Sequence, residues 1–229
     1  MNGAAGGDDE RVAIVISSAA RPATLAVALA RHPDALVIAA DGGVAAATAL
    51  GIDVDIVVGD LDSIDERQLA DAVKRGVEVE RHPPEKDATD LELAVKRALA
   101  RRVTRIVVVD STDGRLDHFL AGMILLASGS LVGVEVTAYV DDATVTVVRA
   151  GTARTVPAPV GATVTLVPTH GAAVGVVTEG LRYPLARETL VAGSTRGVSN
   201  IVDRPDATVS VTAGSLLIIV PGATAGEQA

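Results

Sequence analysis

The chain has 229 residues, a formal net charge of −9 and a pI of about 4.9, and it contains no cysteine. The acidic balance argues against nucleic-acid and anionic-membrane partners, which need a basic surface, and the lack of cysteine excludes disulfides and thiolate metal sites. No apolar run approaches the length of a membrane span, and the polar first ten residues lack the apolar core of a secretory signal. We therefore expect a cytoplasmic protein.

From Arg11 to about Val140, short apolar strands alternate with amphipathic helices. The sequence predicts strands over residues 12–16, 36–40, 56–59, 77–81, 105–110 and 134–140, and helices over 22–31, 44–50, 65–75, 89–100 and 116–127. Strands that alternate with helices in this way form a parallel sheet that helices cover on both faces.

After about Asp142 the composition changes, and Val, Thr, Gly and Pro dominate. Short strands separated by turn residues are predicted over 144–148, 162–167, 174–178, 208–212 and 216–220. This pattern is typical of a small all-β sandwich or barrel. We place an α/β domain at 11–141 and an all-β domain at 142–222, in direct contact because no Gly/Ser-rich linker separates them.

The stretch IVVGDLDSI, residues 56–64, is the strongest chemical signal. A buried strand runs into Gly59, and the carboxylates of Asp60 and Asp62 follow one residue apart. In an extended or gently turning backbone alternate side chains point the same way, and Mg²⁺ prefers carboxylate and phosphate oxygens. The alternative is a polar turn in which Asp62 or Ser63 caps the next helix.

Two further strands also end in an aspartate, namely Asp41 and Asp110. Ligands of open parallel sheets bind outside the carboxyl ends of the strands, so that edge should be unusually acidic. Like charges brought together are unfavourable, and a bound cation would relieve the repulsion.

The segment 86–94, KDATDLELA, adds Asp87 and Asp90 at the start of a helix. The buried stripe of this helix is expected at Leu91, Ala94, Val95 and Ala98. Lys86, one of three lysines in the chain, fits a phosphate site that prefers a compact ammonium. The alternative is a plain capping box of Thr89 and Glu92 beside a solvated lysine.

The segment 113–119, DGRLDHF, places Arg115, Asp117 and His118 in the first turn of another helix. A helix N-terminus beside an arginine is a ready phosphate site, whereas an Arg115–Asp117 surface pair is the alternative. The buried stripe is expected at Leu116, Phe119, Leu120 and Met123. Because the chain carries neither a P-loop nor a dinucleotide-binding fingerprint, the acidic edge favours metal-dependent phosphoryl transfer.

Four motifs, in this order, resemble those of thiamine pyrophosphokinases: Asp41-Gly42-Gly43, GDLDS from Gly59, KDATDLELA from Lys86 and GRLDH from Gly114. The β-rich half adds GLRYPL from Gly180 and GVSN from Gly197, with Leu190 and Gly193 before it. The chain departs from the family pattern at Leu61, where Phe is frequent, at Asp113-Gly114, where paired Gly is usual, and at Tyr183, where some members have Trp. These departures concern the shape of the pocket more than the chemistry.

The resemblance implies a Rossmann-like three-layer α/β domain that binds nucleotide, followed by a β-sandwich that helps to close a thiamine site across the interface of a homodimer. It implies transfer of the pyrophosphoryl group of ATP to the hydroxyl of thiamine, which gives thiamine diphosphate and AMP, with Mg²⁺ as cofactor. The expected partners are ATP, thiamine and a second copy of the chain, with no nucleic acid and no membrane.

Site residues also follow from the resemblance, motif by motif. Catalysis would rest on Asp60, Asp62, Asp87 and Asp90, with Mg²⁺ held by Asp60, Asp62 and Asp90. ATP would be contacted by Asp41, Gly42, Gly43, Ser63, Lys86, Thr89, Arg115, Asp117 and His118. Thiamine would be bordered by Tyr183, Ser199 and Asn200, although Tyr183 could equally be an aromatic residue of the sandwich core.

Three rival functions remain on sequence grounds. A related pyrophosphokinase could act on another alcohol, such as a pterin. The stretch DLDS also resembles the entry motif of haloacid-dehalogenase-like phosphohydrolases, in which Asp60 would be the nucleophile, although that motif normally lies on the first strand of its domain. A nucleotide-binding regulatory module without catalysis is the third alternative.

Overall fold

The computed structural model describes residues 10–62, 64 and 66–222. The assignment of Ser63 to ATP and the expectation about a signal in the first nine residues therefore lie outside the described residues. In the part of the chain that is described, no helix is long and apolar enough to cross a membrane.

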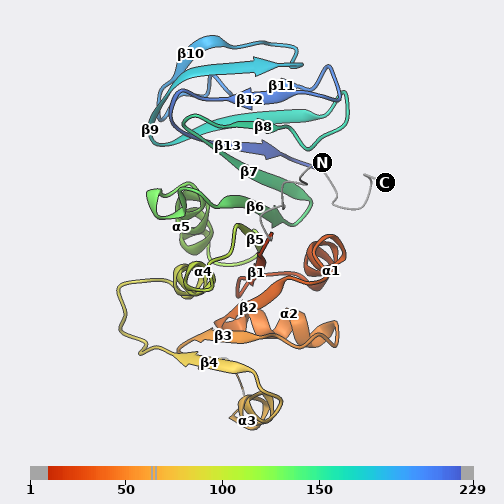
Figure 1. Ribbon diagram of the computed structural model, residues 1–229, viewed down its shortest axis with the longest axis vertical. Coiled ribbons are helices and arrows are strands. Elements are labelled where there is room, and N and C mark those ends of the chain that lie inside the picture. The colour runs from red at the N-terminus through yellow and green to blue at the C-terminus, as the bar shows by residue number, and fades with distance from the viewer. Residues whose placement is uncertain (1–9, 63, 65, 223–229) are drawn as a thin grey trace, which may run out of the picture.

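A parallel sheet organises the first half, as predicted (Figure 1). Its strands are β1 (Val12–Ile16), β2 (Leu36–Ala40), β3 (Ile56–Gly59), β4 (Glu78–Arg81), β5 (Arg105–Asp110) and β6 (Glu135–Val140). They pair in the order β4-β3-β2-β1-β5-β6. The chain builds outward from β1 towards β4 and then continues on the other side from β5, so the strand order reverses between β1 and β5. In open α/β sheets this reversal creates a crevice at the carboxyl edge.

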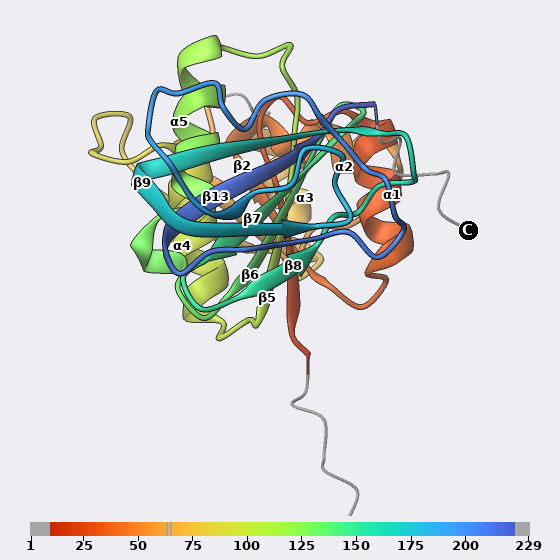
Figure 2. The same cartoon turned by 90° about the horizontal axis from the view of Figure 1, so that it is seen from above.

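Helices cover both faces of this sheet. They are α1 (Pro22–Arg31), α2 (Val44–Ala49), α3 (Glu66–Lys74), α4 (Asp90–Ala100) and α5 (Leu116–Leu126), with the 3₁₀ turns η1 (Asp41–Gly43) and η2 (Gly129–Leu131). Helices α1 and α2 lie on one side of the strands, and α4 and α5 on the other, in both views (Figures 1 and 2). Burial on two faces explains why the central strands are continuous Val and Ile runs.

The predicted stripe of α4 is confirmed, but that of α5 is partly wrong. Met123 is buried as expected, whereas Leu116 is 70% exposed and Leu120 is 51% exposed. Gly122 takes the inner position because a β-carbon there would lie 2.9 Å from Cδ2 of Leu91 on α4. The close approach of the two helices at Gly122 thus rotates the large apolar side chains of α5 outward.

The sheet continues into the second half of the chain without a break. There the strands are β7 (Ala143–Arg149), β8 (Ala153–Thr155), β9 (Thr163–Glu179), β10 (Ala186–Leu190), β11 (Asn200–Ile201), β12 (Thr208–Ser210) and β13 (Ala213–Val220). Strand β7 pairs antiparallel with β6 on one side and with β13 on the other. The proposed domain boundary at 141/142 falls in this β6–β7 hairpin and stays a prediction.

The β-rich half forms the expected sandwich around its own buried cluster of mainly Val and Leu side chains. The prediction of separate strands at 162–167 and 174–178 is wrong, because both belong to the long strand β9. The first part of β9 pairs with β13 and β11, and the second part pairs with β10 and β12. Gly171 and Gly175, at φ values of 109° and 67°, interrupt the apolar pattern at the bend where β9 changes partners.

Candidate active site

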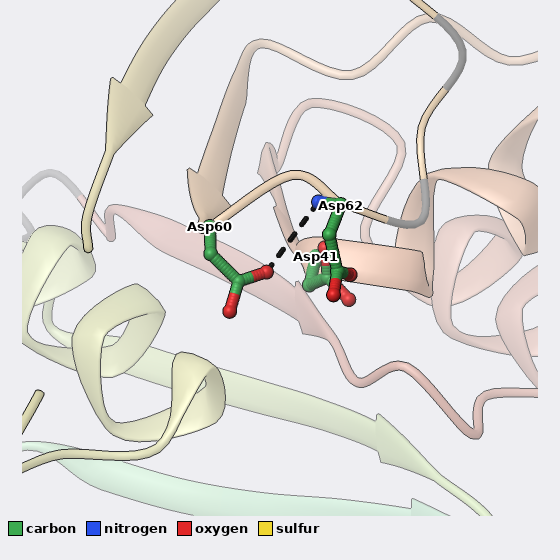
Figure 3. Close-up of side chains that lie close together, drawn as sticks. All are labelled: Asp41, Asp60 and Asp62. Carbon is green, nitrogen blue, oxygen red and sulfur yellow. Dashed lines mark hydrogen bonds between the residues drawn. The ribbon is translucent and has the colours of Figure 1, made fainter. Parts of the chain in front are cut away.

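Three carboxylates meet at the carboxyl edge of the parallel sheet. Asp41 follows β2, and Asp60 and Asp62 follow β3 (Figure 3). One oxygen from each lies within 4.8 Å of the others. The acidic edge predicted from the strand ends is therefore a real cluster. Its third member is Asp41, which we had assigned to ATP, whereas Asp90, which we had assigned to the metal, lies just outside this group.

The backbone of this cluster is turned sharply, in contrast to the extended or gently turning conformation that we expected. Leu61, between Asp60 and Asp62, has a φ of 64°, and Asp41 has a φ of 41°. The Leu61 side chain is only 4% exposed and packs into the core on the α1 and α2 side. Burial of Leu61 thus compensates for a left-handed conformation, and such strain is concentrated at functional sites.

Two glycines allow the close approach of these chain segments. A β-carbon at Gly59 would lie 3.0 Å from both Cβ of Asp41 and Oδ1 of Asp90. A β-carbon at Gly43 would lie 2.5 Å from the carbonyl oxygen of Ile16. Both motif glycines are therefore required by packing around the acidic cluster.

Lys86 joins the cluster to the start of α4. Its Nζ lies 3.2 Å from Oδ2 of Asp60 and 2.7 Å from Oδ1 of Asp90, and the side chain is 13% exposed. Burial opposes the charged ammonium, but its hydrogen bonds to Asp90 and Asp60 raise the pKa of Lys86. Burial likewise acts against ionisation of Asp60, but the hydrogen bond from Lys86 lowers the pKa of Asp60. The alternative of a solvated lysine is therefore wrong, because the ammonium group of Lys86 is paired with two carboxylates.

A cavity of about 460 Å³ opens beside the cluster, at the point where the strand order reverses between β1 and β5. Asp41 and Asp90 line its acidic end, and Phe119 on α5 lines it as well. Several predicted ATP residues also line it, namely Asp41, Thr89, Arg115 and His118. A cavity of this size at a topological switch point is the usual place for a nucleotide in such a sheet.

The wall of the cavity between β1 and β5 combines Asp110, which the strand-end rule had selected, with serines that the sequence analysis had not selected. Asp110 is 4% exposed and accepts hydrogen bonds from Oγ of Ser17 and, at 2.9 Å, from N of Ser111. Burial raises the pKa of Asp110 above its ordinary value. Ser17, Ser18 and Ser111 follow the ends of β1 and β5, so the strand-end rule applied to aspartates would have found them if it had included hydroxyls.

The loop between β5 and α5 is tied to the start of α1. Arg21 Nε donates a 3.0 Å hydrogen bond to Oδ2 of Asp113 and lies 3.1 Å from Oδ1 of Asp141. Nη2 of Arg115 lies 2.6 Å from Oδ2 of Asp117, with both side chains exposed. The surface pair that we considered as the alternative is therefore present, although Arg115 also lines the cavity.

The remaining residues of the KDATD motif differ in their placement. Thr89 caps α4 by accepting a 3.2 Å hydrogen bond from N of Glu92, which is the Thr89 half of the expected capping box, and its side chain also borders the cavity. Asp87 is exposed in the preceding loop and is not part of the carboxylate cluster. Gly42 lies in η1 next to Asp41. Sequence spacing alone thus could not rank Asp87 and Asp90, whereas the fold places Asp90 at the cavity.

The three predicted thiamine residues lie in the sandwich, and none of them lines the nucleotide cavity. Asn200 is 7% exposed; its Oδ1 accepts from N of Tyr183 at 3.0 Å, and its Nδ2 donates to O of Tyr183 at 2.7 Å. Tyr183 itself is 56% exposed, so the alternative of a core aromatic is wrong. Ser199 is exposed, with a φ of 59°, and its N donates to Oγ1 of Thr165.

Comparison with known proteins separates the possible enzyme families. Residues 30–137 match the family model "Thiamin pyrophosphokinase, catalytic domain", and residues 154–216 match "Thiamin pyrophosphokinase, vitamin B1 binding domain". The chain belongs to the thiamin pyrophosphokinase family. A curated thiamine pyrophosphokinase from Bacillus subtilis is 27% identical over 161 residues, which cover 70% of this chain and 75% of the relative.

Solved structures of thiamin pyrophosphokinases have the same fold. The crystal structure of the Bacillus subtilis protein superposes with a TM-score of 0.77 at 24% identity, covering 92% of this chain and 99% of that chain. The thiamin pyrophosphokinase from Candida albicans has a TM-score of 0.75 at 14% identity, covering 93% and 90%. The α/β half followed by a β-sandwich is thereby confirmed, and family and fold together support a thiamine diphosphokinase and do not favour the phosphohydrolase or pterin alternatives.

Proposed function

We propose that this thiamin pyrophosphokinase family member transfers the pyrophosphoryl group of ATP to the hydroxyl of thiamine, with release of AMP, and that its active site is the acidic edge described above. The observation that carries this assignment is the convergence of Asp41, Asp60 and Asp62 on one point. Asp41 also lines a nucleotide-sized cavity, and Lys86 links Asp60 to Asp90, which lines the same cavity. The cavity offers room for the nucleoside, and the carboxylates lie where the triphosphate would end.

The donor set of the cluster fits Mg²⁺. All three side chains offer hard carboxylate oxygens, which this ion prefers, together with phosphate oxygens of a substrate. We assign Asp60 and Asp62 as its protein ligands, with Asp41 as the third. When bound, the ion would neutralise charge on the transferred phosphates. The mutual repulsion of three carboxylates at one point is a physical reason for a cation here.

The chain's own residues would position and neutralise the substrates. Lys86, Thr89 and Arg115 face the cavity or its acidic rim, and we assign them to phosphate oxygens. The hydroxyl oxygen of thiamine would form a bond to the β-phosphorus while the bond to the α-phosphate oxygen breaks, so AMP leaves. We assign acceptance of the hydroxyl proton to Asp90 rather than to the exposed Asp87, because Asp90 lines the cavity.

We further propose a cytoplasmic homodimer in which the sandwich of one copy faces the nucleotide cavity of the other. Within one chain Tyr183 and Ser199 do not reach that cavity, although we assign them, with Asn200, to thiamine. The outward face of α5 carries Leu116, 70% exposed, and Ile124, 54% exposed, next to the cavity loop. An apolar stripe continuous with the site supports a contact between copies there.

A coupled assay for AMP release tests the reaction. The purified chain is incubated with ATP, Mg²⁺ and a panel of alcohols that includes thiamine and a hydroxymethyl pterin. We expect AMP only with thiamine, and loss of turnover when EDTA removes the metal. Formation of ADP or free phosphate, or a phosphorylated Asp60 trapped without ATP, would instead favour the phosphohydrolase.

A further inference from the structure

A second cavity, of about 330 Å³, lies between the end of α1 and strands β6, β7 and β8. It shares no lining residue with the nucleotide cavity. Its walls are polar: Arg31 and Arg154 contribute guanidinium groups, and Thr137, Thr144 and Thr146 contribute hydroxyls. The chain has a net charge of −9, so two guanidinium groups that line one cavity are a local exception to its acidic character.

The charge of Arg154 is poorly compensated. Its ion pair is with Glu135, with 3.9 Å between Nη2 and Oε2, and that same oxygen lies 3.1 Å from Nη2 of Arg105. Nε of Arg154 is buried without a hydrogen-bond partner among the described residues. A buried N–H donor that is left without an acceptor is unfavourable, so an anion in the cavity that accepts a hydrogen bond from this Nε would stabilise the side chain.

Neighbouring groups increase the local positive charge. Arg149 and Arg154 line a further cavity together, so their side chains lie near each other. Burial and, after it, the positive charge of Arg154 lower the pKa of Arg149. On the opposite wall, Nη1 of Arg31 donates to Oη of Tyr139 at 3.3 Å, and its guanidinium carbon lies 5.6 Å from the centroid of that ring. The stacking leaves the planar guanidinium held in a fixed orientation at the rim of the cavity.

We propose that this second cavity binds the phosphate group of a small anion, with Arg154 and Arg31 as the charged donors and the threonine hydroxyls as neutral donors. Guanidinium groups match phosphate oxygens in pairs, and hydroxyls add single hydrogen bonds. Helix α1 links the two cavities, because Arg31 lies in its last turn and Arg21, at its start, holds Asp113 of the nucleotide loop. A ligand here would therefore contact the helix whose Arg21 holds the β5–α5 loop at the nucleotide cavity.

Calorimetric titration of the full chain with inorganic phosphate, at low ionic strength and without divalent metal, tests this proposal. We expect Arg154→Ala to weaken phosphate binding about 10-fold, because a charge-assisted hydrogen bond is lost. The matched control is Arg75→Ala on the distant α3 end, where an exposed arginine pairs with Asp53; it should bind like wild type. Glu135→Gln should tighten binding, because it removes the competing carboxylate.

Phosphate affinity should fall in Arg154→Ala and rise in Glu135→Gln, so the test remains decisive if either variant is destabilised. Arg154→Lys keeps the charge and should have an intermediate affinity. Binding that is lost in Lys86→Ala but retained in Arg154→Ala would place the phosphate in the nucleotide cavity and overturn the proposal. Absence of any phosphate binding at millimolar concentration would overturn it as well. Titrations of wild type and Arg154→Ala with AMP and with thiamine diphosphate distinguish the sources of the phosphate group, because only a ligand of the second cavity should bind more weakly to the variant.

Discussion

The acidic edge of the parallel sheet and the Tyr183–Asn200 region of the sandwich are assigned to one active site, yet the chain holds them in different ways. At the edge, carboxylates are brought together against their mutual repulsion, with one oxygen of each within 4.8 Å of the others. In the sandwich, the side chain of Asn200 is buried and bonded to the backbone of Tyr183. The first arrangement keeps like charges close together at a cost in free energy. The second provides hydrogen-bond partners for backbone N–H and C=O groups.

This difference distinguishes the residues that we assign to the reaction from the residues that fix the conformation of the binding loop. A carboxylate that faces other carboxylates contributes little to folding and is available for a cation or a phosphate. An amide that completes three hydrogen bonds in a buried place contributes mainly to the shape of the loop that carries Tyr183. Substitutions at the edge should therefore change turnover, and substitutions at Asn200 should change stability first.

The largest effect is expected for Asp62→Asn. Turnover should fall at least ~100-fold, the usual scale for loss of a key electrostatic group, because one metal-ligand charge is removed. The melting temperature should not fall, since the substitution relieves repulsion with Asp41 and Asp60. Steady-state AMP release and a thermal melt measure the two quantities.

A matched control is Asp71→Asn on α3, which removes one carboxylate from an exposed pair with Lys74. It should turn over like wild type. If Asp62→Asn retains wild-type turnover, Asp62 is not in the active site. The acidic edge and the Tyr183–Asn200 region could then not be distinguished by their effects on turnover and stability.

Asn200→Ala tests the other side of the comparison. It removes the acceptor for N of Tyr183 and N of Ile201 and the donor to O of Tyr183. Because Asn200 is 7% exposed, we expect a loss of about 2 kcal/mol in the free energy of unfolding. Urea unfolding measures this loss, and the KM for thiamine should rise more than the KM for ATP.

Ser199→Ala is the comparison variant for Asn200. Ser199 is exposed and its hydrogen bond to Thr165 uses the backbone N–H, so the unfolding free energy should change by less than about 0.5 kcal/mol. Equal destabilisation in the two variants would show that the Asn200 hydrogen bonds do not hold the loop.

Arg115→Ala is expected to have a smaller effect, confined to the nucleotide. The Arg115–Asp117 pair is fully exposed, so unfolding should be unchanged. If the guanidinium contacts phosphate, the KM for ATP should rise about 10-fold, the scale of one charge-assisted hydrogen bond. An unchanged KM would show that Arg115 forms only the surface ion pair with Asp117. The control is Arg182→Ala, which breaks an exposed ion pair with Asp203.

The fold of the first half was predictable because the sequence repeats one local rule. The central strands are rich in Val and Ile and helices follow between them, so the boundaries of α1 and β5 agree with the structure. The second half was harder, because β9 contains Gly171 and Gly175 inside one strand. Glycine normally marks a turn, and only the change of pairing partners from β13 to β10 shows that the strand continues.

In the site, the sequence predicted that carboxylates gather at the strand ends, but not which three of them share one point or how the backbone brings them there. Asp60 and Asp41 were predictable from strand ends and the rule that ligands bind there. The left-handed turn at Leu61 was not, because it depends on burial of that side chain in a core assembled from distant segments. The outward face of α5 was also missed, since the inner position is decided by contact between Gly122 and Leu91 across two helices.

The smallest effect, and the one that sharpens the comparison, is expected for Asp110→Asn. Asp110 lies in the cavity wall but is held like Asn200, with bonds from Ser17 and Ser111 that an amide oxygen could keep. Because burial raises its pKa above the unfolded value, the carboxyl group favours folding below its unfolded pKa of about 4, and this advantage is lost as pH rises through the folded pKa. The variant does not titrate, so its stability relative to wild type should increase from pH 4 to pH 7. Unfolding free energies of both proteins at the two pH values measure this difference. A difference that stays constant with pH would show that Asp110 is not held in a desolvated wall, and it would then belong with the reacting carboxylates.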